Sequence, residues 1–127
     1  MNLEKVVFGF FIVLAATLNF GFVYGDIDLP HHHQAWEFVA AFAVNIVATI
    51  LKFGDRTQVG AIHLATSLVA LLQVAAAALV WFFALPGPGG TMTAATAASV
   101  VSLSAGALLA NVISVVILIV ETTMQRR

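Results

Sequence analysis

The residues of this chain that are best suited to chemistry gather in one short segment. Six acids and histidines lie between positions 26 and 37: Asp26, Asp28, His31, His32, His33 and Glu37. Imidazole together with carboxylate suits Zn²⁺ and similar divalent ions, whereas carboxylates alone suit harder cations. In a helix that begins near Pro30, His33 and Glu37 are four residues apart and share a face. The segment therefore predicts a divalent-metal site formed by the three histidines and Glu37, and no other cofactor. The plainer alternative is a solvated acidic loop, because patterns this short often arise by chance.

A polar stripe begins in the same part of the sequence. Its members recur every three or four residues: Glu37, Ala41, Asn45, Thr49 and Lys52. That spacing places them on one face of a helix. Because lipid would penalise such a face, we expect it to point toward other helices or toward water. The stripe predicts either the wall of a permeation path or a set of hydrogen bonds between packed helices.

The first of these alternatives leads to a channel hypothesis. The residues assigned to the path or to its outer mouth are Asp26, Asp28, Glu37, Asn45, Thr49 and Lys52. The acids would attract cations at the mouth, as charged rings do in channels, and Asn45 and Thr49 would line the path. Lys52 opposes this assignment, because an ammonium group at the inner end repels cations unless Asp55 or Glu121 neutralises it. Otherwise the pore tolerates anions or lies elsewhere.

Small residues form a ridge at four-residue spacing in the last third of the chain. They are Ala94, Ala98, Ser102, Gly106, Ala110 and Ser114. Such a ridge lets helix backbones approach closely, within one chain or between copies. Packing within the chain is one alternative. A chain this small has little interior of its own, however, and a ridge of this length suits self-association, so we expect a homo-oligomer. The residues assigned to helix packing are Ser102, Gly106, Ala110 and Ser114.

Other polar residues interrupt the apolar segments. Three of them are the amides Asn19, Gln73 and Asn111. An amide in an apolar environment needs a hydrogen-bond partner. These three predict either an interhelical network or the lining of a weakly selective aqueous path. His63 could ligate haem, relay protons or hydrogen-bond a neighbour. Of these we favour a satisfied histidine near the inner surface, paired with Asp55 or Gln58.

The elements that position these residues are long apolar stretches. Hydrophobic residues make up 61% of the chain and charged residues 9%, against roughly 25% charged residues in soluble domains. The run 57–120 has no Asp, Glu, Lys or Arg, and as one helix it would be roughly 96 Å long, so it must contain at least two spans. We expect an all-α, polytopic membrane protein with a single domain of four transmembrane helices. The expected spans are about residues 6–24, 33–53, 59–85 and 93–120.

The basic residues indicate how these spans are oriented. All five fall on one side of a four-span threading: Lys5, Lys52, Arg56, Arg126 and Arg127. Cytoplasmic loops collect Lys and Arg. We therefore expect both termini in the cytoplasm and the chain in a bacterial inner (plasma) membrane.

The same sequence disfavours several classes of protein. The chain has no cysteine, which excludes disulfide and thiolate chemistry. We do not expect an enzyme, because there is no phosphate-binding glycine loop, no HExxH motif and no convincing Ser-His-Asp set. A net charge of -1 gives no reason to expect nucleic acid as a partner.

The remaining expected partners are lipid, ions and further copies of the chain. The function that these observations favour is a small oligomeric channel or channel-like permeation protein for cations. The alternatives are a non-conducting scaffold subunit of a larger membrane complex and a divalent-metal-binding membrane protein.

Overall fold

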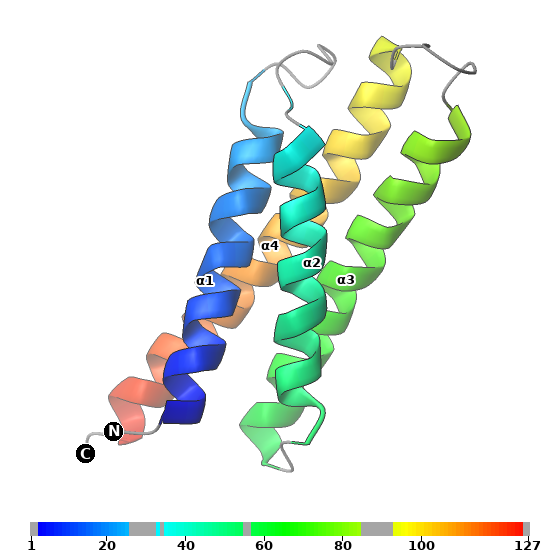
Figure 1. The fold of residues 1–127 in the computed structure, drawn as a ribbon. Coiled ribbons are helices and arrows are strands. Elements are labelled where there is room, and N and C mark those ends of the chain that lie inside the picture. The colour runs from blue at the N-terminus through cyan, green and yellow to red at the C-terminus, as the bar shows by residue number, and fades with distance from the viewer. Residues whose placement is uncertain (1–2, 26–32, 34, 55–56, 85–92, 126–127) are drawn as a thin grey trace.

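Four helices make up the described part of the chain. The computed structural model describes residues 3–25, 33, 35–54, 57–84 and 93–125. The helices are α1 (Leu3–Val23), α2 (Ala35–Lys52), α3 (Gln58–Ala84) and α4 (Ala94–Gln125), as Figure 1 shows. Each is long and apolar enough to cross a membrane. The prediction of an all-α chain with four such helices is confirmed.

The helices run alternately up and down in one bundle (Figure 1). At one end α1 and α3 begin and α2 and α4 finish; we call it the terminal end and the other the opposite end. The packed pairs are α1 with α2, α2 with α3, α3 with α4 and α4 with α1, so the helices close into a ring. The second and third helices are antiparallel neighbours, as the short connection between them predicts.

Side-chain caps start α3 and α4. The Thr57 hydroxyl accepts a hydrogen bond from the Gly60 N–H (2.9 Å), and the Thr93 hydroxyl accepts one from the Thr96 N–H (3.1 Å). Each threonine satisfies a backbone donor that the first helical turn leaves without an intrahelical partner. After α1, Gly25 has a φ of 104°, a left-handed conformation that glycine adopts without strain.

The interior contains two apolar clusters. The larger joins all four helices toward the opposite end and includes Phe22, Phe38, Val74 and Val100. The smaller lies toward the terminal end and consists of Phe8, Ile12 and Ala48, with partly buried neighbours around them. Buried polar side chains lie between and beside these clusters, and they form the candidate site.

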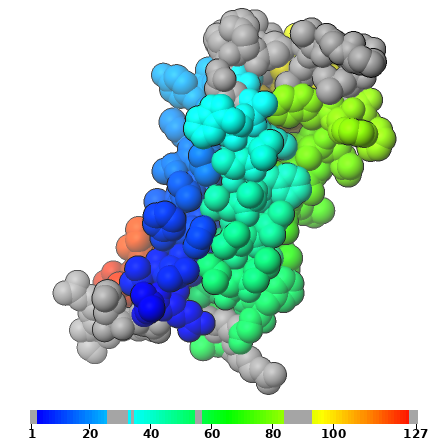
Figure 2. Space-filling model, in the orientation of Figure 1, coloured from blue at the N-terminus to red at the C-terminus, as the bar shows by residue number. Residues whose placement is uncertain are grey.

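The outward faces of the helices are apolar as well. Large hydrophobic side chains are exposed on every helix, among them Phe10, Ile50, Leu72 and Ile119. In the space-filling view the side chains of α1 and α2 close against each other along most of their length (Figure 2). A helix that is apolar all round suits a hydrocarbon surrounding rather than water.

Candidate functional site

The polar stripe of α2 faces the interior of the bundle. Asn45, Thr49 and Lys52 are buried together with Ala41, whereas Glu37 is partly exposed. The expected inward orientation is confirmed for the four buried residues. Because they lie inside a single chain, they do not face a space between copies of it.

Three asparagines from three helices form a hydrogen-bonded chain between the apolar clusters, which we call the amide triad. Asn19 of α1 donates through Nδ2 to Oδ1 of Asn111 of α4 (2.7 Å). Asn111 donates through Nδ2 to Oδ1 of Asn45 of α2 (2.9 Å), and Asn45 donates to the Ala41 carbonyl (2.8 Å). These bonds give each buried amide the partner that an apolar environment requires. An interhelical network of amides, one of the two predicted alternatives, is therefore present.

One ionisable residue from each helix meets at the terminal end. This terminal-end cluster consists of Lys5 (α1), Lys52 (α2), His63 (α3) and Glu121 (α4). Lys5 Nζ lies 2.9 Å from Glu121 Oε2, and Glu121 Oε1 lies 3.9 Å from His63 Nε2. Lys52 Nζ lies 4.3 Å from the centroid of the Phe8 ring, whose centroid is 4.9 Å from that of His63. Phe8 thus contacts both Lys52 and His63, and it receives the Lys52 ammonium by a cation–π contact.

Two hydroxyls determine which nitrogen of His63 carries a hydrogen. Thr66 Oγ1 donates to the His63 carbonyl (3.0 Å), so it accepts in its 2.8 Å bond with Ser114 Oγ. Ser114 has then used its only hydrogen, and it must accept from His63 Nδ1 at 3.0 Å. The Nδ1 position is therefore the protonated one in the neutral ring, and Nε2 presents a lone pair toward Glu121.

A pocket at the terminal end reaches Glu121. Its volume is about 360 Å³, and its lining residues are Thr57, Gln58, Val59, Glu121 and Met124. The Glu121 side chain is 16% exposed and that of His63 is 1% exposed. Glu121 consequently connects the pocket with a histidine that solvent does not reach directly.

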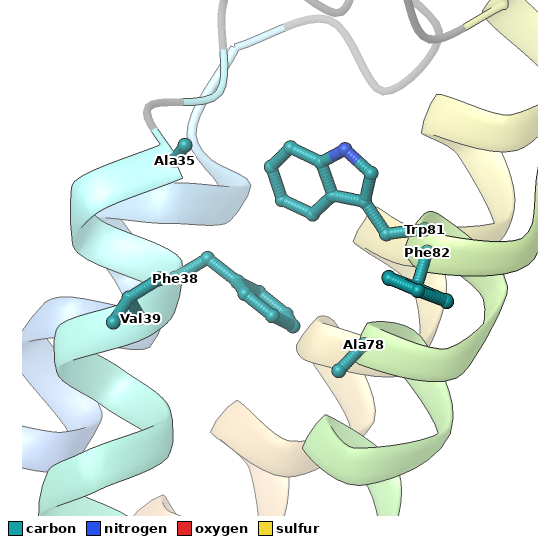
Figure 3. Close-up of a pocket in the computed structure, with 6 residues that line it drawn as sticks. All are labelled: Ala35, Phe38, Val39, Ala78, Trp81 and Phe82. Carbon is teal, nitrogen blue, oxygen red and sulfur yellow. The ribbon is translucent and has the colours of Figure 1, made fainter. Parts of the chain in front are cut away.

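Aromatic rings close the opposite end of the interior. Phe22 (α1), Phe38 (α2) and Trp81 (α3) form what we call the aromatic triangle, with ring centroids 5.1, 5.3 and 5.9 Å apart. The His33 ring lies 5.5 Å from that of Phe22, and its Nδ1–H donates to the Phe22 carbonyl. These rings lie between the amide triad and the opposite end of the bundle, and Figure 3 shows two of them, Phe38 and Trp81, between α2 and α3.

The predicted outer mouth and metal site fall largely outside the described residues. These include Asp26, Asp28, His31 and His32. Within the described ranges no three His, Asp or Glu side chains gather closely enough to hold a metal ion. Glu37 lies against Gly21 of α1, where a Cβ would overlap its Oε2. The divalent-metal site stays a prediction.

The small-residue ridge divides into two halves. Ala110 and Ser114 are buried, and Ser114 bonds to α3 as described above. Gly106 is partly buried and lies against the amide of Gln73, which therefore joins α3 to α4 instead of entering the amide triad. Ala94 and Ser102 are exposed. The second half of the ridge is thus used for packing within the chain.

Sequence reasoning missed the terminal-end cluster as a unit. It assigned Asp55 or Gln58 to His63. The structure shows Ser114 and Glu121 beside His63, and Gln58 lines the pocket. Asp55 lies outside the described residues, so its pairing with His63 stays a prediction. Lys5 and Glu121 are far apart in sequence, and only the placement of α1 beside α4 brings them together. The sequence did indicate that the two residues lie at the same end of the bundle, because Lys5 is near the start of α1 and Glu121 is near the end of α4, which runs in the opposite direction.

Four helices of this length and apolarity indicate a polytopic helical membrane protein. Its interior contains the amide triad and, toward the terminal end, the terminal-end cluster of ionisable residues. Residues 32–122 match a family of unknown function, DUF6394, and the chain belongs to that family. No curated protein and no solved structure matches the chain.

Proposed function

We propose that this protein is a small membrane permeation protein for cations, that the cation is the proton, and that its path runs through the interior of each bundle. The observation that carries the proposal is the position of His63, fully buried between the Glu121 carboxylate and the Ser114 hydroxyl. An ionisable residue buried among membrane-crossing helices is expensive to keep, and it marks ion or proton pathways by default.

The terminal-end cluster favours protons over metal cations. Lys5 and Lys52 bring two ammonium groups to the same end as Glu121, whose Oε1 lies 3.9 Å from His63 Nε2. A metal cation that passes the cluster meets two ammonium groups as well as the Glu121 carboxylate. A proton needs only an acceptor at each step, and His63 Nε2 and the Glu121 carboxylate face each other as acceptors. The difficulty that Lys52 poses for a simple cation pore is thereby reduced.

Buried hydroxyls extend this route toward the amide triad. Ser67 and Ser104 have buried Oγ atoms with no hydrogen-bond partner among the described residues. Ser67 lies one turn from His63 on α3, and its carbonyl accepts from Thr49 Oγ1 at 3.4 Å. Each free hydroxyl can bind an interior water, which is the usual carrier of protons between side chains. The aromatic triangle would then be the point that has to open.

Proton flux into vesicles tests the proposal. In proteoliposomes that hold a pH-sensitive dye, a K⁺ diffusion potential should drive proton uptake through the wild-type protein. Changing His63→Gln or Glu121→Gln should reduce uptake to the level of vesicles without protein. Glu4→Gln, an exposed acid of the same end, is the matched control and should keep wild-type uptake. Wild-type vesicles no more permeable than empty ones, or full uptake in His63→Gln, would refute the proposal.

A second candidate is a non-conducting subunit of a larger membrane complex. Two observations favour it: the amide triad is satisfied by direct bonds, and the aromatic triangle closes one end. This candidate predicts no flux of protons, Na⁺ or K⁺, together with co-purification of a partner protein. The flux assay therefore separates the two candidates.

Orientation and assembly belong to the same proposal. Lys5 and Lys52 lie at the terminal end, and the sequence adds Arg56 between α2 and α3 and two arginines after α4. We infer from the positive-inside rule that the terminal end faces the cytoplasm of a bacterial inner membrane. The exposed first half of the α4 ridge, with Ala94 and Ser102, is the surface we assign to self-association.

A further inference from the structure

Three hydrogen bonds form a loop that begins and ends on His63, which we call the hydroxyl loop. His63 Nδ1 bonds to Ser114 Oγ (3.0 Å), Ser114 Oγ bonds to Thr66 Oγ1 (2.8 Å), and Thr66 Oγ1 donates to the His63 carbonyl (3.0 Å). The loop therefore crosses from α3 to α4 and returns to α3. Because a carbonyl oxygen can only accept, the last bond fixes the direction of the other two.

Thr66 is the residue that sets this direction, although its own donor bond is to the backbone. Its single hydrogen goes to the His63 carbonyl, so Thr66 accepts from Ser114, and Ser114 accepts from His63 Nδ1. The neutral ring then presents the lone pair of Nε2 to Glu121 Oε1, 3.9 Å away. If Ser114 donated to Nδ1 instead, the ring hydrogen would be on Nε2.

Packing holds the imidazole ring while the hydroxyl loop places its hydrogen. The Phe8 ring contacts the ring of His63 edge to face, with centroids 4.9 Å apart and an angle of 65° between the planes. The His63 side chain is also buried. A change in the hydroxyl loop can therefore move the hydrogen from one ring nitrogen to the other without turning the ring.

We propose that Thr66 is a positioning residue for His63, and that it acts through Ser114 to keep the hydrogen of the neutral imidazole on Nδ1. A neutral histidine takes up a proton at the nitrogen that carries the lone pair. With Thr66 in place, that nitrogen faces Glu121, which lines the terminal-end pocket. Without the Thr66 hydroxyl, Ser114 loses its acceptor, turns its hydrogen to Nδ1, and the ring hydrogen moves to Nε2. The effect of this exchange on proton flux rests on the proposed function, whereas the exchange itself does not.

Nitrogen-15 NMR of histidine-labelled protein in lipid vesicles tests the proposal at alkaline pH, where imidazole is neutral. The two nitrogens of a neutral ring have separate shifts, and correlations to the ring carbons distinguish Nδ1 from Nε2. A spectrum of His63→Gln identifies the His63 signals among those of the four histidines. The wild-type protein should have the hydrogen on Nδ1. Thr66→Val, which replaces the hydroxyl by a methyl group, should have it on Nε2.

Three further variants make the test specific. Thr66→Ser restores the hydroxyl and should restore the wild-type spectrum. Ser114→Ala removes the acceptor of the Nδ1 hydrogen directly and should also move it to Nε2. Thr17→Val is the matched control, because the Thr17 hydroxyl likewise donates to the carbonyl three residues earlier (2.9 Å) but lies exposed on α1. It should leave the His63 signals unchanged. A wild-type hydrogen on Nε2, or one that stays on Nδ1 in Thr66→Val, would overturn the proposal.

The vesicle flux assay measures the consequence for proton uptake. Thr66→Val should lower uptake relative to the wild type, and Thr17→Val should not. Full uptake by a Thr66→Val protein whose ring hydrogen has moved to Nε2 would overturn the positioning role. The spectra establish the tautomer whether or not the wild-type protein passes protons, so a failure of this proposal and a failure of the proposed function can be told apart.

Discussion

At the scale of single residues, direct hydrogen bonds between side chains satisfy the amide groups that are buried in this interior. Asn111 is central, because it accepts from Asn19 and donates to Asn45 across three helices. The sequence indicates that such amides need partners, but not which amide finds which. Asn19 and Asn111 are 92 positions apart in the chain, and their contact depends on helix rotations that single-residue polarity does not encode.

Removing the central amide should destabilise the bundle. Asn111→Leu leaves one donor and one acceptor buried without partners, and we expect it to lower the free energy of unfolding by about 1–2 kcal/mol. Changing all three triad asparagines to leucine should lower it by less than the sum of the single changes, because no buried group is then left unsatisfied. Denaturant titration in micelles measures both. Strictly additive losses would show that the three residues act separately.

At the scale of helices, two pairs of neighbouring helices approach closely because one helix of each pair has a glycine at the contact. A Cβ at Gly21 of α1 would overlap the Glu37 carboxylate of α2, and one at Gly106 of α4 would lie 2.7 Å from Gln73 Oε1 of α3. The ridge pattern predicted close packing of the helix that contains Gly106. Nothing in the sequence near Gly21 indicated its contact, because a single glycine in an apolar helix has no periodicity to read. Helix faces were thus predictable, and pairwise contacts were not.

The contact of Gly21 with Glu37 gives a prediction at this scale. Gly21→Ala must push the end of the flexible Glu37 side chain away from α1, so we expect a small loss in unfolding free energy, below about 1 kcal/mol. In a Glu37→Ala background the same change should be nearly neutral. Gly54→Ala is the control, since a Cβ there meets nothing within 4 Å. An equal loss in both backgrounds would mean that Gly21 matters for some reason other than the carboxylate.

At the scale of the whole molecule, the two ends of the bundle differ in the kind of side chain that they contain. The terminal-end cluster contains two lysines, and aromatic rings dominate the other end. The number of helices and their alternation could be predicted from apolar length and basic residues alone. The cluster could not, because its members come from four helices and are adjacent only once the ring of helices closes.

The orientation of the bundle can be measured directly because the chain has no cysteine. Single cysteines at Tyr24, exposed at the opposite end, and at Thr123, exposed at the terminal end, should differ in intact cells. An impermeant thiol reagent should label Tyr24→Cys at once and Thr123→Cys only after the membrane is permeabilised. The reverse pattern would place the basic residues outside and contradict the proposed topology.

The unequal helices have a consequence for the bilayer itself. At 1.5 Å per residue, the 18 residues of α2 span about 27 Å and the 32 residues of α4 about 48 Å, and the two stand diagonally across the ring. A hydrocarbon layer of roughly 30 Å fits α2 closely, whereas α4 must tilt or draw thicker bilayer around it. Lipid would therefore contact a short helix, α2, on one side of the bundle and a long helix, α4, on the other. We therefore expect the bundle to be best accommodated where thinner and thicker regions of bilayer adjoin.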